Sequence, residues 1–306
     1  MRAALNVLAE ELRRLKATGQ KAVSVAPESM ARLQRAIAAQ RGSAGIAVAA
    51  EARVPAPIAP PVPPAVRRTV PVVEPVVKAP TLPPPPAVKL PGGEKKNRWA
   101  ALLELVTNDP VCRSHARPGK KVVLGVGDLD AQIMFVGEAP GAEEELQGEP
   151  FVGPAGQLLT KMIGAMGLKR SDVYIGNIMN WRPELPLTGG GVQVGNRPPT
   201  EEEMRYCLPF LRAQIEIVQP RLMVALGSTA AQGLLGFGTF KALGEVRGQW
   251  KDFSGTPLLV TYHPSYILRS QSNRSKRMIW EDLLKVMERA ALPVSEKQRG
   301  YFLENK

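Results

Sequence analysis

The stretch from residue 133 to residue 159, IMFVGEAPGAEEELQGEPFVGPAGQLL, constrains the fold of this chain more than any other. Residues 133–136 form a short run that is apolar on both faces, which is typical of a buried parallel strand. The run ends at residues 137–141, GEAPG, where two glycines and a proline indicate a tight turn. Residues 155–166 then show helical spacing. Ligands of open α/β sheets bind at such carboxyl strand ends, so we expect the functional site here.

Strand and helix patterns continue to alternate along the chain. Thr200 followed by a run of glutamates suits the start of one of these helices, because it provides a cap and favourable charge. The alternation predicts an α/β protein, a three-layer α/β/α sandwich with a mostly parallel central sheet. We expect strands at 121–125, 131–137, 172–179, 222–227 and 258–263. We expect helices from near residue 97 to residue 106 and at 155–166, 200–218, 228–235 and 276–291.

The composition of the chain changes abruptly before the folded part. About half of the 29 prolines lie between residues 52 and 93, interleaved with Val and Ala. Such a segment builds no core and predicts an extended, polyproline-like spacer. An alternative use is as a ligand for a protein partner that recognises proline. The expected divisions are a helical or flexible basic segment (1–51, with helices at 2–16 and 27–40), a Pro-rich disordered linker (52–96), the folded domain (97–294) and a C-terminal tail (295–306).

The positive charge is concentrated in the N-terminal arm. The whole chain carries a net charge of +12. Residues 1–96 hold 15 Lys and Arg against 6 Asp and Glu, a net +9, and residues 97–306 hold 25 against 22, a net +3. A basic arm beside a nearly neutral domain suggests attraction to the phosphates of nucleic acid. A solvated linker that happens to be rich in Lys and Arg is an equal alternative.

Several protein classes are excluded by simple features of the sequence. The chain has no apolar run near the roughly 20 residues that span a bilayer, so we expect no integral membrane protein. Glu10 and Glu11 interrupt the N-terminal pattern, which lacks the apolar core of a secretory signal. Two cysteines, Cys112 and Cys207, cannot form a disulfide framework. We therefore expect a cytoplasmic protein with reduced thiols.

Polar and aromatic side chains follow three of the predicted strands. Glu138 and Phe151 come after the first, Asn177 lies near the end of YIGNIMNWRP, and His263 begins HPSYILR. The carboxyl ends of parallel strands meet at one edge of a sheet, so we expect these four side chains to converge.

Two motifs carry a resemblance to a known family. The GEAPG turn followed by PFVG-x-AG resembles the uracil-DNA glycosylases, most closely the family-four, iron–sulfur type. The segment HPSYILR, from His263 to Arg269, resembles the HPS loop of the same superfamily. The resemblance implies an α/β/α fold and removal of uracil from DNA, and it agrees with the predicted architecture.

The resemblance assigns a uracil pocket to the converging residues. Enzymes that act on a base in a duplex flip it out of the stack. Phe151 would stack on uracil, and the Asn177 amide would donate to O4 and accept from N3–H. His263 would donate to O2 as negative charge develops on the leaving base. Gly137 and Glu144 would complete the pocket. A core role for Phe151 and a turn-capping role for Asn177 are the plainer alternatives.

The loop after His263 is the expected DNA contact. In the superfamily an apolar side chain of this loop enters the minor groove as the base leaves. The same loop offers hydroxyl and basic groups for phosphates, although it could also be solvated surface. The wedge candidates are Tyr266, Ile267 and Leu268, and the phosphate-binding candidates are Ser265, Arg269, Arg274 and Lys276.

The group that activates water is left open by the sequence. The best-known branch of the superfamily has an aspartate directly after the position of Glu138, where this chain has Ala139, as family four does. Glu138 or Glu144 would orient the water, or water would attack with little help from a base. Motif matching favours Glu138, and we expect Glu143 and Glu145 to be solvated.

The chain departs from family four at the iron–sulfur cluster. Family-four enzymes hold a four-iron cluster on four cysteines, and the corresponding positions here are Asp109, Cys112, Trp181 and Cys207. Two thiolates are missing, and an indole does not ligate iron. We therefore expect no cluster and no other cofactor.

These features together predict a DNA-repair enzyme. We expect a monofunctional hydrolase that cleaves the N-glycosidic bond of deoxyuridine and leaves an abasic site, because the motifs contain no lysine for a Schiff base. We expect a monomer that acts on uracil-containing DNA at the nucleoid. The rivals are an inactive glycosylase-fold protein that binds DNA or recruits a partner, and a glycosylase for another deaminated base.

Overall fold

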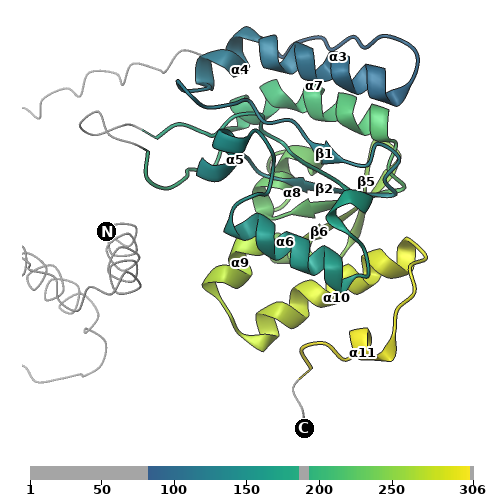
Figure 1. Ribbon diagram of the computed structural model, residues 1–306. Coiled ribbons are helices and arrows are strands. Elements are labelled where there is room, and N and C mark those ends of the chain that lie inside the picture. Colours follow the sequence, from purple (N-terminus) through teal and green to yellow (C-terminus); the bar gives the residue numbers. More distant parts are fainter. Residues whose placement is uncertain (1–81, 186–192, 304–306) are drawn as a thin grey trace, which may run out of the picture. The chain divides into compact units, whose positions relative to one another are not determined.

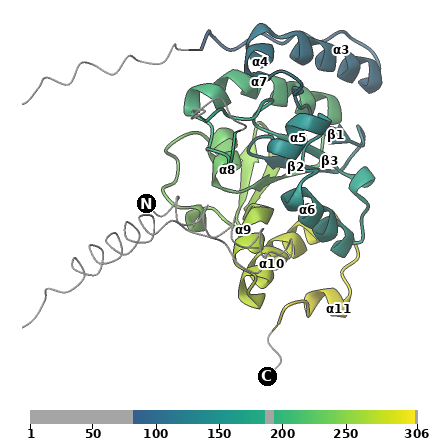
Figure 2. The same ribbon diagram turned by 60° about the vertical axis from the view of Figure 1, so that its left-hand side comes forward.

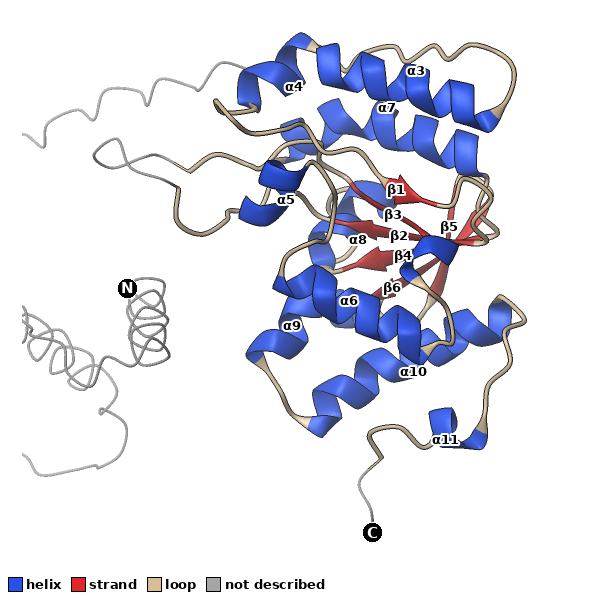
Figure 3. Ribbon diagram, in the orientation of Figure 1, coloured by secondary structure: helices blue, strands red, loops and turns tan. Residues whose placement is uncertain are grey.

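The computed structural model describes residues 82–185 and 193–303 of the chain. The helices expected at 2–16 and 27–40 and most of the Pro-rich linker lie outside these residues. Six strands form one sheet with the order β1-β3-β2-β4-β6-β5 (Figure 3). The four central strands are parallel, and β1 and β5 pair antiparallel at the two edges. The strands are β1 (Val126–Gly127), β2 (Ile133–Gly137), β3 (Tyr174–Asn177), β4 (Leu222–Leu226), β5 (Trp250–Phe253) and β6 (Thr256–Thr261).

Helices cover both faces of this sheet, so the predicted α/β/α sandwich is confirmed. Figures 1 and 2 show α3 and α7 side by side on one face, and α6 and α10 on the other. The α-helices among the described residues are α3 (Lys95–Asn108), α4 (Pro110–His115), α5 (Ala142–Gln147), α6 (Pro154–Ala165), α7 (Glu201–Val218), α8 (Ser228–Leu235), α9 (Pro264–Arg269), α10 (Asn273–Arg289) and α11 (Glu296–Arg299). None of them is long and apolar enough to cross a membrane.

Alternating side chains of β2 divide the core into two layers. Met134 and Val136 pack with the residues of α3, α7 and α8. Ile133 and Phe135 pack with the residues of α6, α9 and α10. All five residues of β2 are buried, as expected for a strand that is covered on both faces.

The segment 121–125 differs from its predicted strand. It is extended but lies outside the sheet ladder, which begins at Val126. Its hydrogen bonds go instead to other segments, and Val123 pairs with Asn180, whose main-chain carbonyl accepts from Val123 N at 2.8 Å and whose side-chain amide donates to Val123 O at 3.1 Å. Lys121 N donates to the Glu145 carbonyl at 2.7 Å, and Gly125 N donates to Gln214 Oε1 at 3.0 Å. These contacts take the place of a neighbouring strand.

Both ends of the folded domain extend beyond the expected limits of 97 and 294. Leu82, Val88 and Leu90 lie partly buried against the core, although they belong to the expected linker. Leu82 N donates to Glu202 of α7 at 2.6 Å. In the tail, the Gln298 carbonyl accepts from the indole of Trp280 at 2.6 Å. The Pro-rich segment thus ends as a strap on the domain, which we define as residues 82–94.

Candidate active site

A cavity of about 490 Å³ lies at the carboxyl ends of the central strands. Its lining includes Glu138 after β2, Asn177 at the end of β3, Gly227 after β4 and His263 after β6. Phe151 enters from the loop between α5 and α6. The structure therefore brings together the four side chains that the parallel sheet was expected to gather.

Phe151 and Asn177 are packed against the end of β2. Phe151 has φ +55°, an uncommon conformation for a residue with a side chain, and its ring is almost fully buried. A Cβ at Gly137 would collide with this ring and with Asn177 Oδ1. A Cβ at Gly156 would collide with the Phe151 carbonyl. Two glycines of the family motif thus make room for the strained loop that holds the ring.

Asn177 carries an unpaired acceptor in the cavity wall. The residue is 6% exposed, and its Oδ1 is buried without a hydrogen-bond partner among the described residues. A buried polar atom without a partner is costly and rare, and a catalytic or binding role is one of the few explanations for it. The side-chain Oδ1 of Asn177 is therefore free to accept a hydrogen bond from an N–H group of a bound ligand.

His263 is held as a neutral donor. Ser265 N donates to His263 Nδ1 at 3.2 Å, and Ser265 Oγ lies 2.8 Å from the same nitrogen. Because Nδ1 accepts, the neutral ring carries its proton on Nε2, which bonds to no other described residue. Burial, and secondarily the charge of Arg269, lowers the pKa of His263 to about 4. The ring centroid lies 5.6 Å from that of Phe151.

Glu138 is a desolvated carboxylate at the cavity. Burial raises the pKa of Glu138 above its ordinary value, and a hydrogen bond from Thr229 opposes the rise. Thr229 also lines the cavity from the first turn of α8. Thr229 was not predictable from the sequence, because nothing local connects a threonine in a helix with a carboxylate about 90 positions earlier.

The neighbouring glutamates have structural roles. Glu144 accepts from Gly141 N at 3.0 Å, from Val152 N at 3.0 Å and from Gly153 N at 2.9 Å. It therefore ties the GEAPG turn to the Phe151 loop, and its oxygens are largely occupied. Glu143 is exposed as expected. The expectation that Glu145 is solvated is wrong: it is 5% exposed.

Glu145 is buried because it neutralises Arg182. Arg182 Nη1 lies 2.9 Å from Glu145 Oε1, and Lys120 Nζ lies 3.6 Å from the same oxygen. The other side of the guanidinium donates to Asn196 Oδ1 at 2.8 Å. Asn196 lines the cavity, with its Nδ2 near the GEAPG turn. Asn196 was not predictable from the sequence, because its position depends on an arginine from another segment.

The α9 helix places three of the expected DNA-contact residues, Ser265, Tyr266 and Arg269, in the lining of the cavity. Leu268 is 42% exposed, whereas Ile267 is 8% exposed and belongs to the core, so Ile267 is wrong as a wedge candidate. Tyr266 lines the cavity and stacks on Tyr262, with 4.4 Å between ring centroids. Arg269 donates to Ser265 at 3.1 Å. Ser265 and Arg269 therefore support the His263 ring. Arg274 is exposed and Lys276 is partly exposed in the first turns of α10.

The four positions that the resemblance assigns to a cluster do not fit one. Cys112 and Cys207 are fully buried thiols. Asp109 accepts from Tyr206 Oη at 3.0 and 3.1 Å, so its carboxylate is already engaged. Trp181 is 1% exposed and offers only an indole. Among residues 82–185 and 193–303, no three His, Cys, Asp or Glu side chains are grouped to hold a metal ion.

Several known proteins similar to this chain belong to one family. A family model for the uracil DNA glycosylase superfamily matches residues 124–284, just over half of the chain. A Type-4 uracil-DNA glycosylase of Thermotoga maritima is 45% identical over 165 residues, which cover 54% of this chain and 80% of that protein. One from Pyrobaculum aerophilum is 39% identical over 183 residues, covering 57% of this chain and 87% of the relative.

A more distant relative is a Type-5 uracil-DNA glycosylase of Pyrobaculum aerophilum. It is 31% identical over 175 residues, which are 54% of this chain and 73% of that protein. The matched region 124–284 contains all six strands of the sheet and the strand ends that surround the cavity. The chain therefore belongs to the uracil-DNA glycosylase superfamily.

Proposed function

We infer that this protein is a uracil-DNA glycosylase of base excision repair. It hydrolyses the N-glycosidic bond of deoxyuridine in DNA, releases uracil and leaves an abasic site. The observation that carries this inference is the buried, unpaired Oδ1 of Asn177 beside the Phe151 ring and the neutral His263 imidazole. These groups offer an acceptor, a stacking face and a donor in one cavity.

The cavity selects uracil by hydrogen bonding. A flipped uracil would stack on Phe151 and place N3–H against Asn177 Oδ1, while the Asn177 amide donates to O4. Cytosine has an acceptor at N3 and a donor at N4, so it would leave the same atoms mismatched. Buried polar atoms without partners give strong discrimination of this kind.

His263 stabilises the leaving group. As the C1′–N1 bond breaks, its electron pair moves onto the uracil ring and negative charge develops at O2. The Nε2–H of a neutral imidazole would donate to this oxygen, and Ser265 holds the ring with Nδ1 as acceptor. A proton need not be transferred for this stabilisation.

Glu138 is the group that we propose to orient the attacking water and accept its proton. The sugar left behind carries oxocarbenium character, and the oxygen of water adds to C1′ while a proton is lost. The partly buried Glu138 carboxylate would orient the water and accept this proton. Glu144 is less suited, because three backbone N–H groups already occupy its oxygens.

The DNA strand would cross the α9 end of the cavity. The exposed Leu268 suits a wedge into the base stack, with Tyr266 beside it at the cavity. Arg274 is exposed at the start of α10 and suits a phosphate. Ser265 contacts Nδ1 of His263 and Arg269 donates to Ser265, so both are already engaged in holding the His263 ring. We also propose that the protein is a cytoplasmic, nucleoid-associated monomer.

The reaction is a simple hydrolysis without a covalent amine intermediate. The described residues that line the cavity include no lysine, so no Schiff base with C1′ would form there. The enzyme is therefore monofunctional, and the abasic strand stays intact until alkali cleaves it.

Uracil-containing oligonucleotides test this function. The full chain is incubated with single- and double-stranded oligonucleotides that carry one uracil, and hot alkali then reveals abasic sites. We expect cleavage at uracil and free uracil in the supernatant by mass spectrometry. Matched oligonucleotides with cytosine or hypoxanthine are the controls. Cleavage only at hypoxanthine would support a glycosylase for another base, and DNA binding without cleavage would support an inactive relative.

A further inference from the structure

Three segments that lie far apart in the sequence meet around the indole of Trp181. This side chain is 1% exposed and follows β3. It stacks on His115 at the end of α4, with 4.8 Å between ring centroids and an interplanar angle of 8°. It also packs at a tilt against Tyr206 of α7, with 6.1 Å between centroids. One aromatic side chain thus connects α4, the β3–α7 connection and α7.

Hydrogen bonds connect two of the same segments. The Tyr206 hydroxyl donates to Asp109, which lies 3.0 Å away through Oδ2 and 3.1 Å through Oδ1. Asp109 Oδ1 also accepts from Cys112 N at 2.8 Å and so caps the start of α4. The carboxylate therefore fixes α4 to α7 and caps a helix at the same time.

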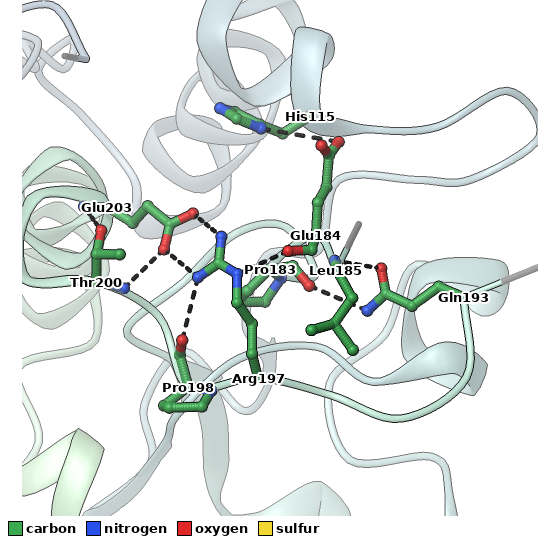
Figure 4. A network of polar contacts seen from close by, with 9 residues as sticks. All are labelled: His115, Pro183, Glu184, Leu185, Gln193, Arg197, Pro198, Thr200 and Glu203. Carbon is green, nitrogen blue, oxygen red and sulfur yellow. Dashed lines mark hydrogen bonds and ion pairs between the residues drawn. The ribbon is translucent and has the colours of Figure 1, made fainter. Parts of the chain in front are cut away.

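Polar contacts and the Arg197–Glu203 ion pair extend the connection toward the surface (Figure 4). His115 Nδ1 lies 3.9 Å from the Glu184 carboxylate, and the Glu184 carbonyl accepts from Arg197 Nε at 2.7 Å. Arg197 then pairs with Glu203 at 2.6 and 2.7 Å. Glu203 accepts from Thr200 N at 2.7 Å and closes the capping box of α7. The path begins on α4 and ends on α7, like the aromatic contacts.

We propose that these contacts, the Trp181 brace, replace an iron–sulfur cluster, so that the protein folds and works without iron. The brace consists of Asp109, His115, Trp181 and Tyr206 with the Glu184–Arg197–Glu203 contacts. It joins the same three segments that carry the expected cluster positions. The cluster would cross-link them through metal bonds, and here packing and hydrogen bonds do so. The proposal that the protein folds without iron rests only on its family membership. The proposal that it is active without iron rests in addition on the proposed function.

The two remaining cysteines behave as small apolar side chains. Cys112 and Cys207 are both 0% exposed and belong to the core cluster that contains Trp181. Buried free cysteines commonly pack in this way. Two thiolates supply half of the ligands that a four-iron cluster takes, and the Trp181 indole occupies the core beside them.

Iron and sulfide analysis tests the proposal directly. The full chain is purified without oxygen, and its visible spectrum, iron and acid-labile sulfide are measured. We expect a colourless protein without stoichiometric iron or sulfide. A brown protein with about four iron atoms per chain would overturn the proposal. The measurement needs no enzymatic activity, so its outcome is separate from that of the proposed function.

Introducing the two missing cysteines tests whether the four positions can form one cluster site. The double variant Asp109→Cys/Trp181→Cys places four cysteines at the four positions. We expect this variant, reconstituted with iron and sulfide without oxygen, to take up iron and become coloured while the parent chain stays colourless. If the folded variant takes up no more iron than the parent, these positions do not share one site and the proposal fails.

Single substitutions test the structural role of the brace. Trp181 Nε1 has no partner among the described residues, so Trp181→Phe keeps the packing and loses no hydrogen bond. We expect Trp181→Phe to melt within a few degrees of the parent and Trp181→Ala to melt roughly 10 °C lower. Tyr206→Phe removes the hydroxyl that donates to Asp109, which then keeps only the bond from Cys112 N, and it should also lower the melting temperature. Equal melting of parent, Trp181→Ala and Tyr206→Phe would show that no brace exists.

Discussion

Asn177 and His263 are the two residues of the cavity on which the proposed recognition of uracil depends. Asn177 keeps a buried oxygen without a described partner, and such an atom costs folding free energy until a ligand satisfies it. His263 is kept neutral by burial and is oriented through Ser265. Both residue types and their strand-end positions were predictable from the sequence. The protonation state of His263 was not, because it depends on burial in the folded protein.

The depressed pKa of His263 predicts how stability changes with pH. Its pKa is lowered from 6.5 to about 4, so between these values the unfolded chain binds a proton that the folded chain does not. This contribution to the free energy of unfolding is full above pH 6.5 and is lost as the pH falls toward 4. Urea unfolding at several pH values measures it.

The control for this prediction is the other histidine. We expect His263→Asn to make stability less dependent on pH between 6.5 and 4 than in the parent chain. His115→Asn leaves His263 in place and should keep the steeper dependence. Identical pH dependence in the parent and His263→Asn would contradict the assignment of a buried, neutral imidazole.

At the scale of elements, the sequence predicts what is periodic and apolar and misses what depends on distant partners. The buried strand β4 and the helix α8 lie close to their expected limits. The edge strand β5, WKDF, was missed because its burial pattern shows no apolar run. Glu145 looked solvated because its partner Arg182 is 37 positions away. Local patterns therefore predict the scaffold better than the polar network behind the site.

The close contact between β2 and the Phe151 loop predicts the effect of adding one methyl group. Gly137→Ala would force the Phe151 ring and Asn177 Oδ1 away, because its Cβ has no room. We expect a loss of about 1–3 kcal/mol in the free energy of unfolding and a large loss of excision. Denaturant unfolding and single-turnover excision measure the two effects.

A glycine in open space is the matched control. Gly164 in α6 has nothing within 4 Å of an added Cβ. Gly164→Ala should therefore leave excision unchanged and raise helix stability by up to about 1 kcal/mol. If Gly137→Ala behaves like Gly164→Ala, the ring and the amide are not held as the structure indicates.

At the scale of the whole molecule, the Pro-rich strap joins the basic arm to the folded domain. The sequence predicted a linker as far as residue 96, but Leu82, Val88 and Leu90 lie against the core. A proline-rich composition hides such contacts, because it gives neither strand nor helix periodicity. Residues 1–81 carry 12 Lys and Arg against 5 Asp and Glu, a net +7, so most of the arm's charge precedes the strap.

Two truncations separate the charge of the arm from the packing of the strap. A chain that begins at residue 82 loses the net +7 but keeps the strap. We expect it to bind DNA more weakly, with a flatter dependence of affinity on salt, and to excise uracil normally at saturating DNA. A chain that begins at residue 95 should in addition be less stable, because the core contacts of the strap are lost. An unchanged salt slope in the first truncation would assign the arm another purpose.

Single-turnover excision by pocket variants tests whether Asn177 and His263 act on the uracil base. The full chain, Asn177→Ala and His263→Ala are compared on one single-stranded oligonucleotide with a single uracil, at saturating enzyme and neutral pH. We expect the parent to release uracil and each variant to be slower by roughly a hundredfold or more, because each loses an interaction with the reacting base. Unfolding of Asn177→Ala should be little changed, since Asn177 Oδ1 has no described partner to lose, whereas His263→Ala also loses the acceptor of Ser265 N. Excision by either variant at the rate of the parent would contradict the account.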